Sequence, residues 1–219
     1  MAFLKRTFVV GDVHGCIDEL LALLFAAQVE NSDELVFCGD LVAKGPDSQA
    51  VVQFARERNA LCVLGNHDAK VLQVGRGAQG SKHHEQVART LREEDFAWLE
   101  KIPFILELNA CNAIVAHGGL VPGLPLSQQQ RDVVINLRSI DASGTPTARI
   151  VGEPWGSRWP GPQHVLFGHD AVRGLQQYPH ATGLDTGCVY GRKLTGIWLP
   201  EHRLVSVPAL KAWSPIEKG

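Results

Sequence analysis

The sequence has no marked excess of either charge. Its 21 Lys and Arg residues nearly balance 23 Asp and Glu residues, and the formal net charge is −2. A chain without a global basic field is not expected to bind nucleic acid nonspecifically. Any phosphate group must therefore be bound by particular side chains or by metal ions.

Cysteine is scarce as well, and long hydrophobic runs are missing. The five cysteines are odd in number, widely spaced and form no Cys-x-x-Cys pair. This pattern favours neither a disulfide framework nor a zinc ribbon and is typical of a reducing compartment. The first apolar run meets Gly11-Asp12 too soon for a signal peptide, and no segment reaches membrane-spanning length. We therefore expect a cytoplasmic protein that does not bind a membrane.

The remaining composition is that of an ordinary globular protein. Hydrophobic residues make up 45% of the chain and charged residues 20%, which argues against disorder and against a coiled coil. A length of 219 residues is enough to bury a large core without a disulfide or structural zinc. Because no repeat or linker divides the sequence, we expect a single domain over residues 1–219.

Short apolar runs alternate with amphipathic segments in the first third of the chain. Thr7–Val10 is predicted to be a strand and Ile17–Val29 a helix. The pattern recurs with a strand at Glu34–Cys38, a helix at Ser48–Arg58 that Ser48 could cap, and a strand at Leu61–Leu64. This alternation predicts an α/β architecture whose sites lie beyond the carboxyl ends of the strands.

The rest of the chain is less regular. Gly75–His84 is predicted to be a loop that could act as a lid, and Glu85–Leu99 a helix. A strand is expected at Ala113–Ala116, followed later by a long surface excursion over Asp141–Pro162. The tail alternates short strands and turns, which suggests a second sheet packed on the first. Its predicted strands are Val165–Phe167, Leu194–Leu199 and Arg203–Val207.

Polar motifs fall at the ends of the predicted strands. Carboxylate, amide and imidazole ligands together suit divalent Mn, Fe, Zn or Co, and an adjacent glycine lets the backbone turn sharply. Taken alone, each motif is more often a turn or a structural histidine. Their common placement predicts a site for two metal ions about 3.5–4 Å apart. The motifs are Gly11-Asp12-Val13-His14-Gly15, Gly39-Asp40, Gly65-Asn66-His67-Asp68, His117-Gly118-Gly119 and Gly168-His169.

Through GDVHG, GD-x-V-x-K-GP, GNHD, HGG and GH, the sequence resembles the calcineurin-like metallophosphoesterases over nearly its whole length. Within that superfamily, GDVHGC, GDLVAKGPDS, VLGNHD, FGHD and GLDTGCVYGRKLT make it similar to the symmetrical diadenosine tetraphosphatases and ApaH-like phosphatases. The resemblance implies a four-layer α/β/β/α sandwich with two mixed sheets flanked by helices. It also implies two divalent ions; we expect Mn²⁺, with Fe, Zn, Co and Mg as alternatives.

The same resemblance implies a ligand set. One ion would be held by Asp12, His14 and Asp40, and the second by Asp40, Asn66, His117 and His169, so that Asp40 bridges.

His67 would by the same resemblance protonate the departing oxygen, a role that suits imidazole because its charge changes near neutral pH. In the related protein Ser/Thr phosphatases, an Asp three residues after the bridging Asp pairs with this histidine. Here that position is Ala43. The departure argues against a protein phosphatase and leaves open what orients His67, with Asp68 and Asp47 as candidates.

Two cationic side chains are candidates for phosphate binding. Lys44 stands where many family members carry Arg, and it would act as a point charge on a phosphoryl group rather than as a bidentate fork. Arg138 lies between the HGG and GH motifs, where relatives carry an Arg that clamps phosphate. Arg131, Arg149 and Arg158 lie in the same interval and could take that role instead.

Other residues are open to two interpretations. Trp155 and Trp159 could stack on a nucleobase, although such tryptophans more often pin a loop to the core. Asp185 is expected to organise its loop, with a metal role as the alternative. His83-His84 is predicted to lie exposed in a loop, because adjacent residues do not converge on one ion without help.

The sequence therefore predicts a phosphohydrolase. The family resemblance implies attack by metal-bound hydroxide without a phosphoenzyme, on a dinucleoside polyphosphate such as diadenosine tetraphosphate, to give two nucleoside diphosphates. The partner is then a small phosphorylated molecule. The alternatives are a phosphoprotein phosphatase, an enzyme acting on polyphosphate or an RNA 5′ cap, a metal-binding or nucleotide-binding module without turnover, and a scaffold that uses the Trp loop as an interface.

Overall fold

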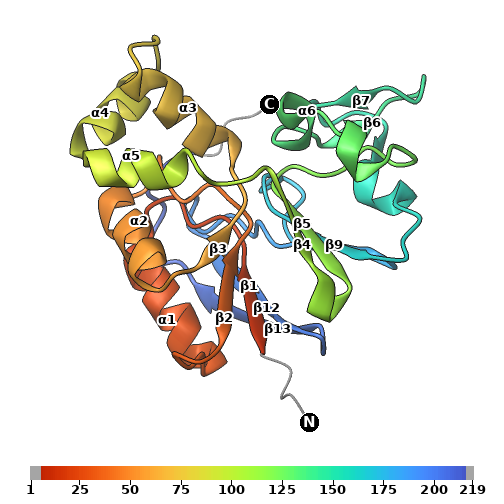
Figure 1. Cartoon of the computed structure of the whole chain (residues 1–219), viewed down its shortest axis with the longest axis horizontal. Helices are drawn as coiled ribbons and strands as arrows, with labels where there is room; N and C mark the ends of the chain where they lie inside the picture. The colour runs from red at the N-terminus through yellow and green to blue at the C-terminus, as the bar shows by residue number, and fades with distance from the viewer. Residues whose placement is uncertain (1–5, 216–219) are drawn as a thin grey trace.

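A computed structural model describes residues 6–215 and forms two facing sheets (Figure 1). The first sheet has the order β13-β12-β1-β2-β3. Strands β1, β2 and β3 run parallel, and β12 and β13 add to β1 as antiparallel neighbours. The strands are β1 (Thr7–Val10), β2 (Glu34–Phe37), β3 (Leu61–Cys62), β12 (Lys193–Leu199) and β13 (Arg203–Pro208).

The second sheet is also mixed and has the order β10-β11-β9-β5-β4. Strands β5, β9 and β11 run parallel, while β4 and β10 pair antiparallel at the edges. The strands are β4 (Ile105–Leu108), β5 (Ala113–Ala116), β9 (His164–Phe167), β10 (Gln176–Tyr178) and β11 (Ala181–Gly183). The expected second sheet is thus present, but the expectation that the last two strands belong to it is wrong. They extend the first sheet through β1.

Side-chain alternation along each strand explains the layers. In β1, Phe8 and Val10 pack in the cluster beneath the helices, whereas Val9 points into the cluster between the sheets. In β5, Val115 points into the same space and Ile114 points to the outer face. Both faces of both sheets are therefore covered, and the two mixed sheets flanked by helices that the sequence predicts are confirmed.

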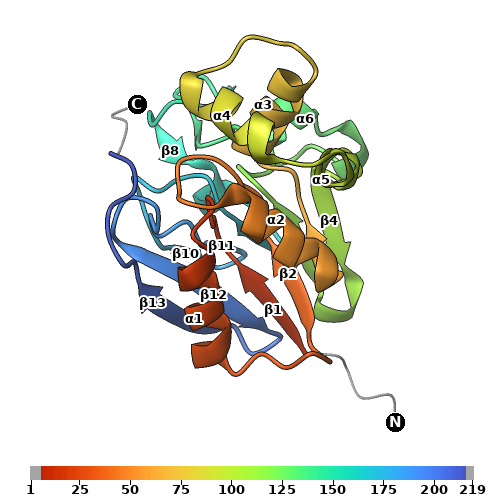
Figure 2. The ribbon, with the colours of Figure 1, turned by 90° about the vertical axis from the view of Figure 1, so that its left-hand side faces the viewer.

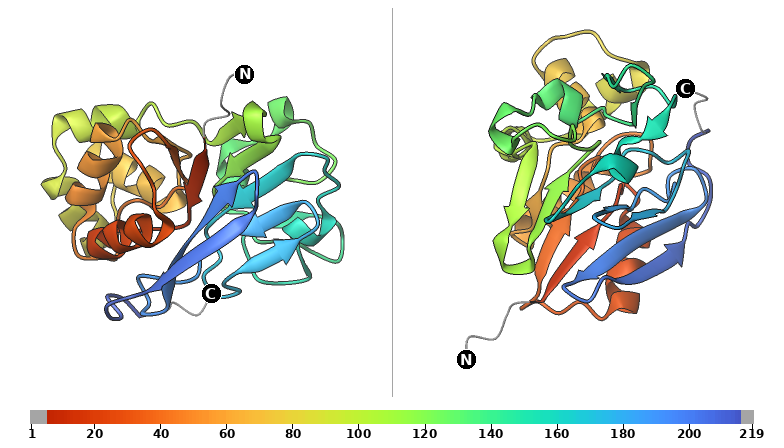
Figure 3. Two further views of the ribbon diagram at one scale, coloured as in Figure 1. Left: turned by 90° about the horizontal axis from the view of Figure 1, so that it is seen from below. Right: turned by 90° about the vertical axis from the view of Figure 1, so that its right-hand side faces the viewer.

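The helices lie mainly on the outer side of the first sheet (Figures 2 and 3). Helix α2 is capped by Asp47, which accepts the N–H of Ala50, rather than by the expected Ser48. The region predicted as a loop and one helix contains two helices, α4 and α5, because Leu91 adopts an extended conformation after α4. The helices are α1 (Ile17–Ala27), α2 (Ser48–Glu57), α3 (Asn66–Gly75), α4 (Lys82–Thr90) and α5 (Glu93–Leu99).

The outer face of the second sheet has a less regular cover. It consists of α6 (Arg131–Val134), a 3-10 turn at Trp155–Arg158, and a third sheet of short strands in the order β7-β6-β8. These strands are β6 (Ser139–Ile140), β7 (Pro146–Thr147) and β8 (Glu153–Pro154). Among the described residues, no helix is long and apolar enough to cross a membrane.

Candidate metal centre

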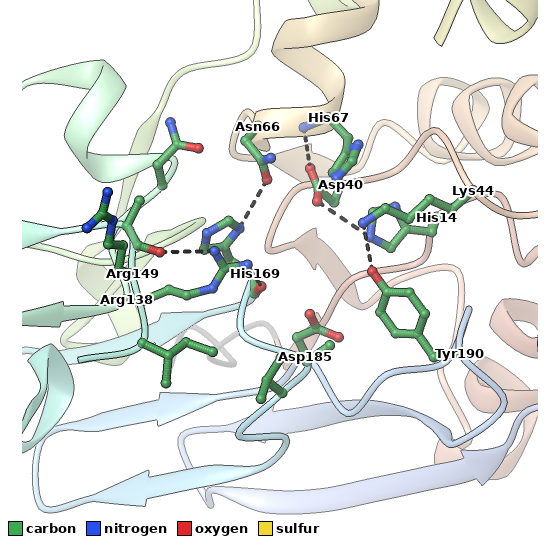
Figure 4. A pocket seen from close by; sticks show the side chains of 15 residues that line it. His14, Asp40, Lys44, Asn66, His67, Arg138, Arg149, His169, Asp185 and Tyr190 are labelled. Atoms are coloured by element: carbon green, nitrogen blue, oxygen red, sulfur yellow. Dashed lines mark hydrogen bonds and ion pairs between the residues drawn. The ribbon is translucent and has the colours of Figure 1, made fainter. Parts of the chain in front are cut away.

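The predicted metal ligands converge at one edge of the paired sheets. Each follows the carboxyl end of a parallel strand, and parallel strands of a sheet bring those ends to the same edge. The first sheet contributes ligands after β1, β2 and β3, and the second after β5 and β9. A pocket of about 360 Å³ opens there (Figure 4). Its lining includes His14, Asp40, Lys44, Asn66, His67, Arg138, Arg149, His169, Asp185 and Tyr190.

Asp40 lies at the centre of this convergence. Its Oδ2 is 3.5 Å from His14 Nε2 and 3.4 Å from His117 Nε2. Its Oδ1 accepts the backbone N–H of His67 at 2.9 Å. Burial alone would raise the pKa of this carboxyl, but the neighbouring histidines, His117 first, outweigh burial and hold the pKa well below its usual range. Asp40 is therefore a carboxylate, in contact with residues from both sheets.

The backbone fixes which nitrogen two of these histidines present. His14 Nδ1 lies 3.0 Å from the carbonyl oxygen of Val42, and His117 Nδ1 lies 2.7 Å from that of Cys38. A carbonyl oxygen only accepts, so each Nδ1 carries the proton and donates it. The Nε2 of each ring faces Asp40, and in the neutral ring this is the nitrogen left to bind a metal, as metal-ligating histidines require.

Asn66 and His169 bring further donor atoms to the same place. Asn66 Oδ1 lies 3.0 Å from His117 Nε2 and 3.1 Å from His169 Nδ1. The Nε2 of His169 is buried and has no hydrogen-bond partner among the described residues. A buried polar atom without a partner is costly. A cation bound beside it would remove that cost.

The charge balance of the site also fits divalent cations. Ligand atoms of Asp12, Asp40 and His117 lie within 4.8 Å of one another. Burial first, and then the carboxylate of Asp185, raise the pKa of Asp12 well above its usual value. Burial by itself lowers the pKa of His117, but Asp40 and Asp12 outweigh it and raise the pKa to about 10. The clustered carboxylates thus attract positive charge, and the donor set of carboxylate, imidazole and amide suits a divalent metal.

Glycine allows the backbone to approach these ligands. A Cβ on Gly168 would lie 1.9 Å from Asp12 Oδ1, and one on Gly65 would lie 2.1 Å from Asp40 Oδ1. Asp12 also accepts the N–H of His169, at 3.0 Å to Oδ2. Gly65 and Gly168, which precede Asn66 and His169, therefore leave room for the carboxylates of Asp40 and Asp12.

The two predicted phosphate-binding cations both line the pocket. Lys44 Nζ donates to the hydroxyl of Tyr190 at 2.8 Å. Arg138 is held by the carbonyl oxygens of Ala148 and His169, each 3.2 Å from a guanidinium nitrogen. Of the alternatives to Arg138, only Arg149 joins it in the pocket lining, because Arg158 pairs with Glu153. Arg131 lines another pocket, beside Arg76.

His67 lines the pocket at the start of α3, and burial lowers its pKa to about 4. Neither expected partner orients its ring. Asp68 accepts the N–H groups of Leu41 and Val42 through Oδ1 and that of Gly65 through Oδ2, and Asp47 caps α2. Instead, His67 Nδ1 lies 3.0 Å from His84 Nε2.

The expectation that His83-His84 is an exposed loop is therefore wrong. Both residues lie in α4, which begins just before them at Lys82 and is capped by Ser81. His83 Nε2 accepts the backbone N–H of Lys44. Ser81 was a local N-cap signal for this helix, but the contacts of the helix with residues 44 and 67 depend on the tertiary fold.

Neither of the two tryptophans lines the pocket of the metal centre. Trp155 is 1% exposed and packs against Phe167 with ring centroids 4.8 Å apart. Trp159 packs against Trp155 and donates its indole N–H to the carbonyl oxygen of Gln163. Both indoles fix the excursion to the second sheet, which is the other interpretation of the pair. Asp185 organises its loop as expected by accepting the N–H of Gly187, and it also lines the pocket.

Residues 5–204 match the model of the calcineurin-like phosphoesterase family. A solved structure of a candidate diadenosine tetraphosphatase is 40% identical, with a TM-score of 0.89 and 95% of each chain covered. The symmetrical bis(5′-nucleosyl)-tetraphosphatase of Coxiella burnetii is 30% identical, over 95% of this chain and 93% of the relative. The asymmetrical bis(5′-nucleosyl)-tetraphosphatase PrpE of Oceanobacillus iheyensis is 29% identical, over 91% and 90%.

These likenesses cover nearly the full length of both partners in each comparison. The match therefore includes both sheets and every strand end that carries a predicted ligand. This chain belongs to the calcineurin-like phosphoesterase family, a family of hydrolases that depend on divalent metal ions.

Proposed function

We propose that the protein hydrolyses dinucleoside polyphosphates, with diadenosine tetraphosphate cleaved to two ADP. The observation that carries this proposal is the shared pocket, in which donor atoms for divalent ions lie beside Lys44 and Arg138. A volume of about 360 Å³ is within the range of small-molecule sites. The names of the similar proteins from Coxiella burnetii and Oceanobacillus iheyensis support the same substrate class.

The residues fit two divalent ions, and we propose Mn²⁺ for both. Bound there, the ions would supply Lewis acidity by neutralising phosphate charge and lowering the pKa of water. We assign Asp12, His14 and Asp40 to one ion. The other is assigned Asp40, Asn66, His117 and His169, with Asp40 shared because it is central to both groups.

Three further side chains of the pocket, Lys44, Arg138 and His67, act on the substrate directly. Lys44 and Arg138 attract the phosphate chain from opposite sides of the site and hold it in one register (Figure 4). Burial lowers the pKa of His67 to about 4 in the protein alone, and the negative charge of a bound phosphate chain raises that pKa. His67 then donates a proton to the departing phosphate oxygen, which would otherwise leave as a more highly charged and poorer leaving group. Asp185 stays near Asp12 and contributes negative charge that favours cations in the site.

A phosphoprotein phosphatase is the second candidate function. The same metal centre would support it, but Ala43 stands where those phosphatases carry the Asp that pairs with the acid histidine. Polyphosphate and RNA caps present the same anhydride bond and therefore belong in the same test. A cytoplasmic location and a single domain over residues 1–219 stay predictions.

The test is hydrolysis of diadenosine tetraphosphate, polyphosphate and a phosphopeptide in parallel, each with Mn²⁺, Fe²⁺, Zn²⁺, Co²⁺ or Mg²⁺ and after chelation. Products are resolved by chromatography, and Asp40→Asn serves as the metal-site control. ADP as the sole nucleotide product supports the proposal, whereas ATP with AMP would make the cleavage asymmetrical. A clear preference for the phosphopeptide or polyphosphate would overturn the substrate assignment and leave the metal assignment standing.

A further inference from the structure

A chain of three side chains links helix α4 to His67. His67 Nδ1 lies 3.0 Å from His84 Nε2, and His84 Nδ1 lies 2.6 Å from Ser81 Oγ. The two imidazole rings are nearly parallel, with centroids 5.2 Å apart and planes inclined by 14°. Helices α3 and α4, which carry the two histidines, lie side by side in Figures 1 and 2.

This chain allows two orders of protons, and orientation of His67 as an acid requires the one in which Ser81 Oγ acts only as an acceptor. Ser81 Oγ caps α4 by accepting the backbone N–H of His84 at 3.3 Å, and it has a second lone pair. His84 Nδ1–H can donate to that lone pair, which leaves His84 Nε2 as an acceptor. His67 Nδ1–H then donates to His84 Nε2. In this order the Nε2 of His67 stays free to carry the proton that is donated to the substrate.

We propose that His84 is the positioning residue of His67, replacing the Asp that the related protein phosphatases place where this chain has Ala43. The proposal rests on the proposed phosphohydrolase function and on His67 acting as its acid. Ala43 has no side chain that could accept from Nδ1, and both oxygens of Asp68 accept backbone N–H groups. His84 is the side chain that the structure places on His67 Nδ1.

Helix α4 holds His84 at this position from two sides. Val87, one turn later, is buried in the cluster shared with α1 and α2. His83, the neighbouring residue, accepts the backbone N–H of Lys44. The helix therefore contacts both the acid and the loop that carries a phosphate-binding cation, so a shift of α4 would displace the two together.

A neutral imidazole differs from an Asp in what it does to the acid. An Asp would add a negative charge that holds the proton on His67, whereas neutral His84 orients the ring without adding charge. The hydrogen bond to His84 therefore fixes the orientation of the His67 ring. Its loss should reduce the rate of proton donation and leave substrate affinity unchanged, because His84 does not line the pocket that holds Lys44 and Arg138.

The kinetic test compares aryl phosphates whose phenols differ in acidity. His84→Ala should lower kcat on phenyl phosphate, a poor leaving group, by about tenfold to a hundredfold, which is part of the roughly 10²–10⁴-fold that a general acid supplies. On 2,4-dinitrophenyl phosphate, which needs no acid, kcat should change less than about threefold, and KM should stay the same on both. His84→Gln, whose amide oxygen can accept from Nδ1, should restore much of the loss.

Two controls make the result specific. Gln86→Ala changes an exposed residue of the same helix and should leave both kcat values unchanged. Adding His84→Ala to His67→Asn should cause no further loss on phenyl phosphate. An equal loss on both leaving groups, or a full additional loss in the double variant, would overturn the positioning role and make His84 a structural residue only.

A spectroscopic measurement separates failure of this inference from failure of the proposed function. In metal-free protein with ¹⁵N-labelled histidine, His67 Nδ1 should give the signal of a protonated, exchange-protected nitrogen. His84→Ala should remove that protection, and Gln86→Ala should not. If the wild-type protein hydrolyses neither diadenosine tetraphosphate nor an aryl phosphate, the proposed function fails but this signal still tests the contact. If the signal is absent in the wild type, the positioning role is wrong even for an active enzyme.

Discussion

The same strands form two regions of opposite character. Between the sheets, Val9, Val36 and Leu166 are fully buried and apolar. A few residues further along the chain, past the carboxyl ends of these strands, Asp12 and Asp40 are almost as deeply buried but ionisable. Burial by itself therefore does not indicate stabilisation. The free energy of burial is favourable for an apolar side chain and unfavourable for an ionised one.

Magnitudes make the contrast clear. Burying a Val or Leu side chain contributes about 1.5–3 kcal/mol. At the strand ends, His14, Asp40 and His169 hold positive φ angles of 49°, 49° and 68°, and each such backbone costs on the order of 1–3 kcal/mol. The buried carboxylates add a desolvation cost. The core between the sheets therefore provides the free energy that holds the strand ends in an unfavourable arrangement suited to binding ions.

Asp40→Asn gives the largest expected effect and tests that contrast directly. A metal ion supplies several kcal/mol of transition-state stabilisation, so kcat should fall by about 10³-fold or more at saturating Mn²⁺. The metal-free variant should stay folded in water but unfold at a lower urea concentration than the metal-free wild type, because the buried His117 loses the carboxylate that favours its charged form.

The readouts are diadenosine tetraphosphate turnover and urea denaturation in chelator. Asp18→Asn changes an exposed carboxylate on α1 and should alter neither. A variant that loses activity only because it unfolds would contradict the proposed separation of the two regions.

Leu166→Ala makes the opposite change in the core. Leu166 lies in β9 and is fully buried between the sheets. Truncation should lower the free energy of unfolding by about 2–5 kcal/mol through lost apolar burial and a residual cavity. At a temperature where the variant stays folded, kcat should match the wild type. A change in kcat with little change in the urea midpoint would show that the core also tunes the site.

The sequence was most informative where local motifs and strand ends coincide. Gly39-Asp40 and Gly65-Asn66 follow parallel strands, and parallel strands bring their carboxyl ends together, so convergence could be predicted without coordinates. The α/β architecture was predictable for a similar reason, since the first three strands alternate with helices, whereas the two mixed sheets were implied by the family resemblance. The assignment of β12 and β13 was not, because an apolar antiparallel strand fits the edge of either sheet.

The packing of one helix against the next was the part that the sequence could not provide. His84 reaches His67 because α3 and α4 pack side by side, and nothing in the sequence around His84 specifies that packing. For the tryptophans, the interpretation that they pin a loop to the core was correct, but the sequence could not name the surface that they cover. Trp155 lies in a segment rich in Gly and Pro that resembles an exposed loop, yet a Cβ on Gly119 would lie 2.2 Å from its ring, so it packs closely on the backbone of the HGG motif.

Lys44→Ala should have a smaller effect than either preceding change. It removes a charge that attracts the substrate without removing an ion, and charge-assisted hydrogen bonds contribute about 1.5–3 kcal/mol, so KM should rise roughly tenfold. Lys44→Arg should retain most of the affinity. Tyr190→Phe, which removes the hydroxyl that accepts from Lys44, should raise KM less than Lys44→Ala. An unchanged KM in Lys44→Ala would assign phosphate binding to Arg138 or Arg149 instead.

The smallest expected effect compares the two ends of β9. His169 follows its carboxyl end at the site, whereas His164 begins the strand at the far end, with Nε2 2.9 Å from Thr182 Oγ1. Burial first, and then the nearby His202 and His180, lower the pKa of His164 to about 4. The unfolded chain thus binds this proton more readily than the folded chain, so its contribution to stability is complete above about pH 6.5 and is lost as pH falls toward about 4.

His164→Gln keeps a side chain that can bond to Thr182 and removes the titrating ring. In metal-free protein, urea denaturation at pH 7.5 and pH 5 should show a smaller loss of stability on acidification for the variant than for the wild type. His202→Gln, which removes an exposed neighbour whose ring centroid is 4.5 Å away, should show a weaker effect in the same direction. Equal losses of stability in the wild type and in His164→Gln would contradict this prediction. The acid sensitivity would then arise at the ionisable residues of the metal centre and not at His164.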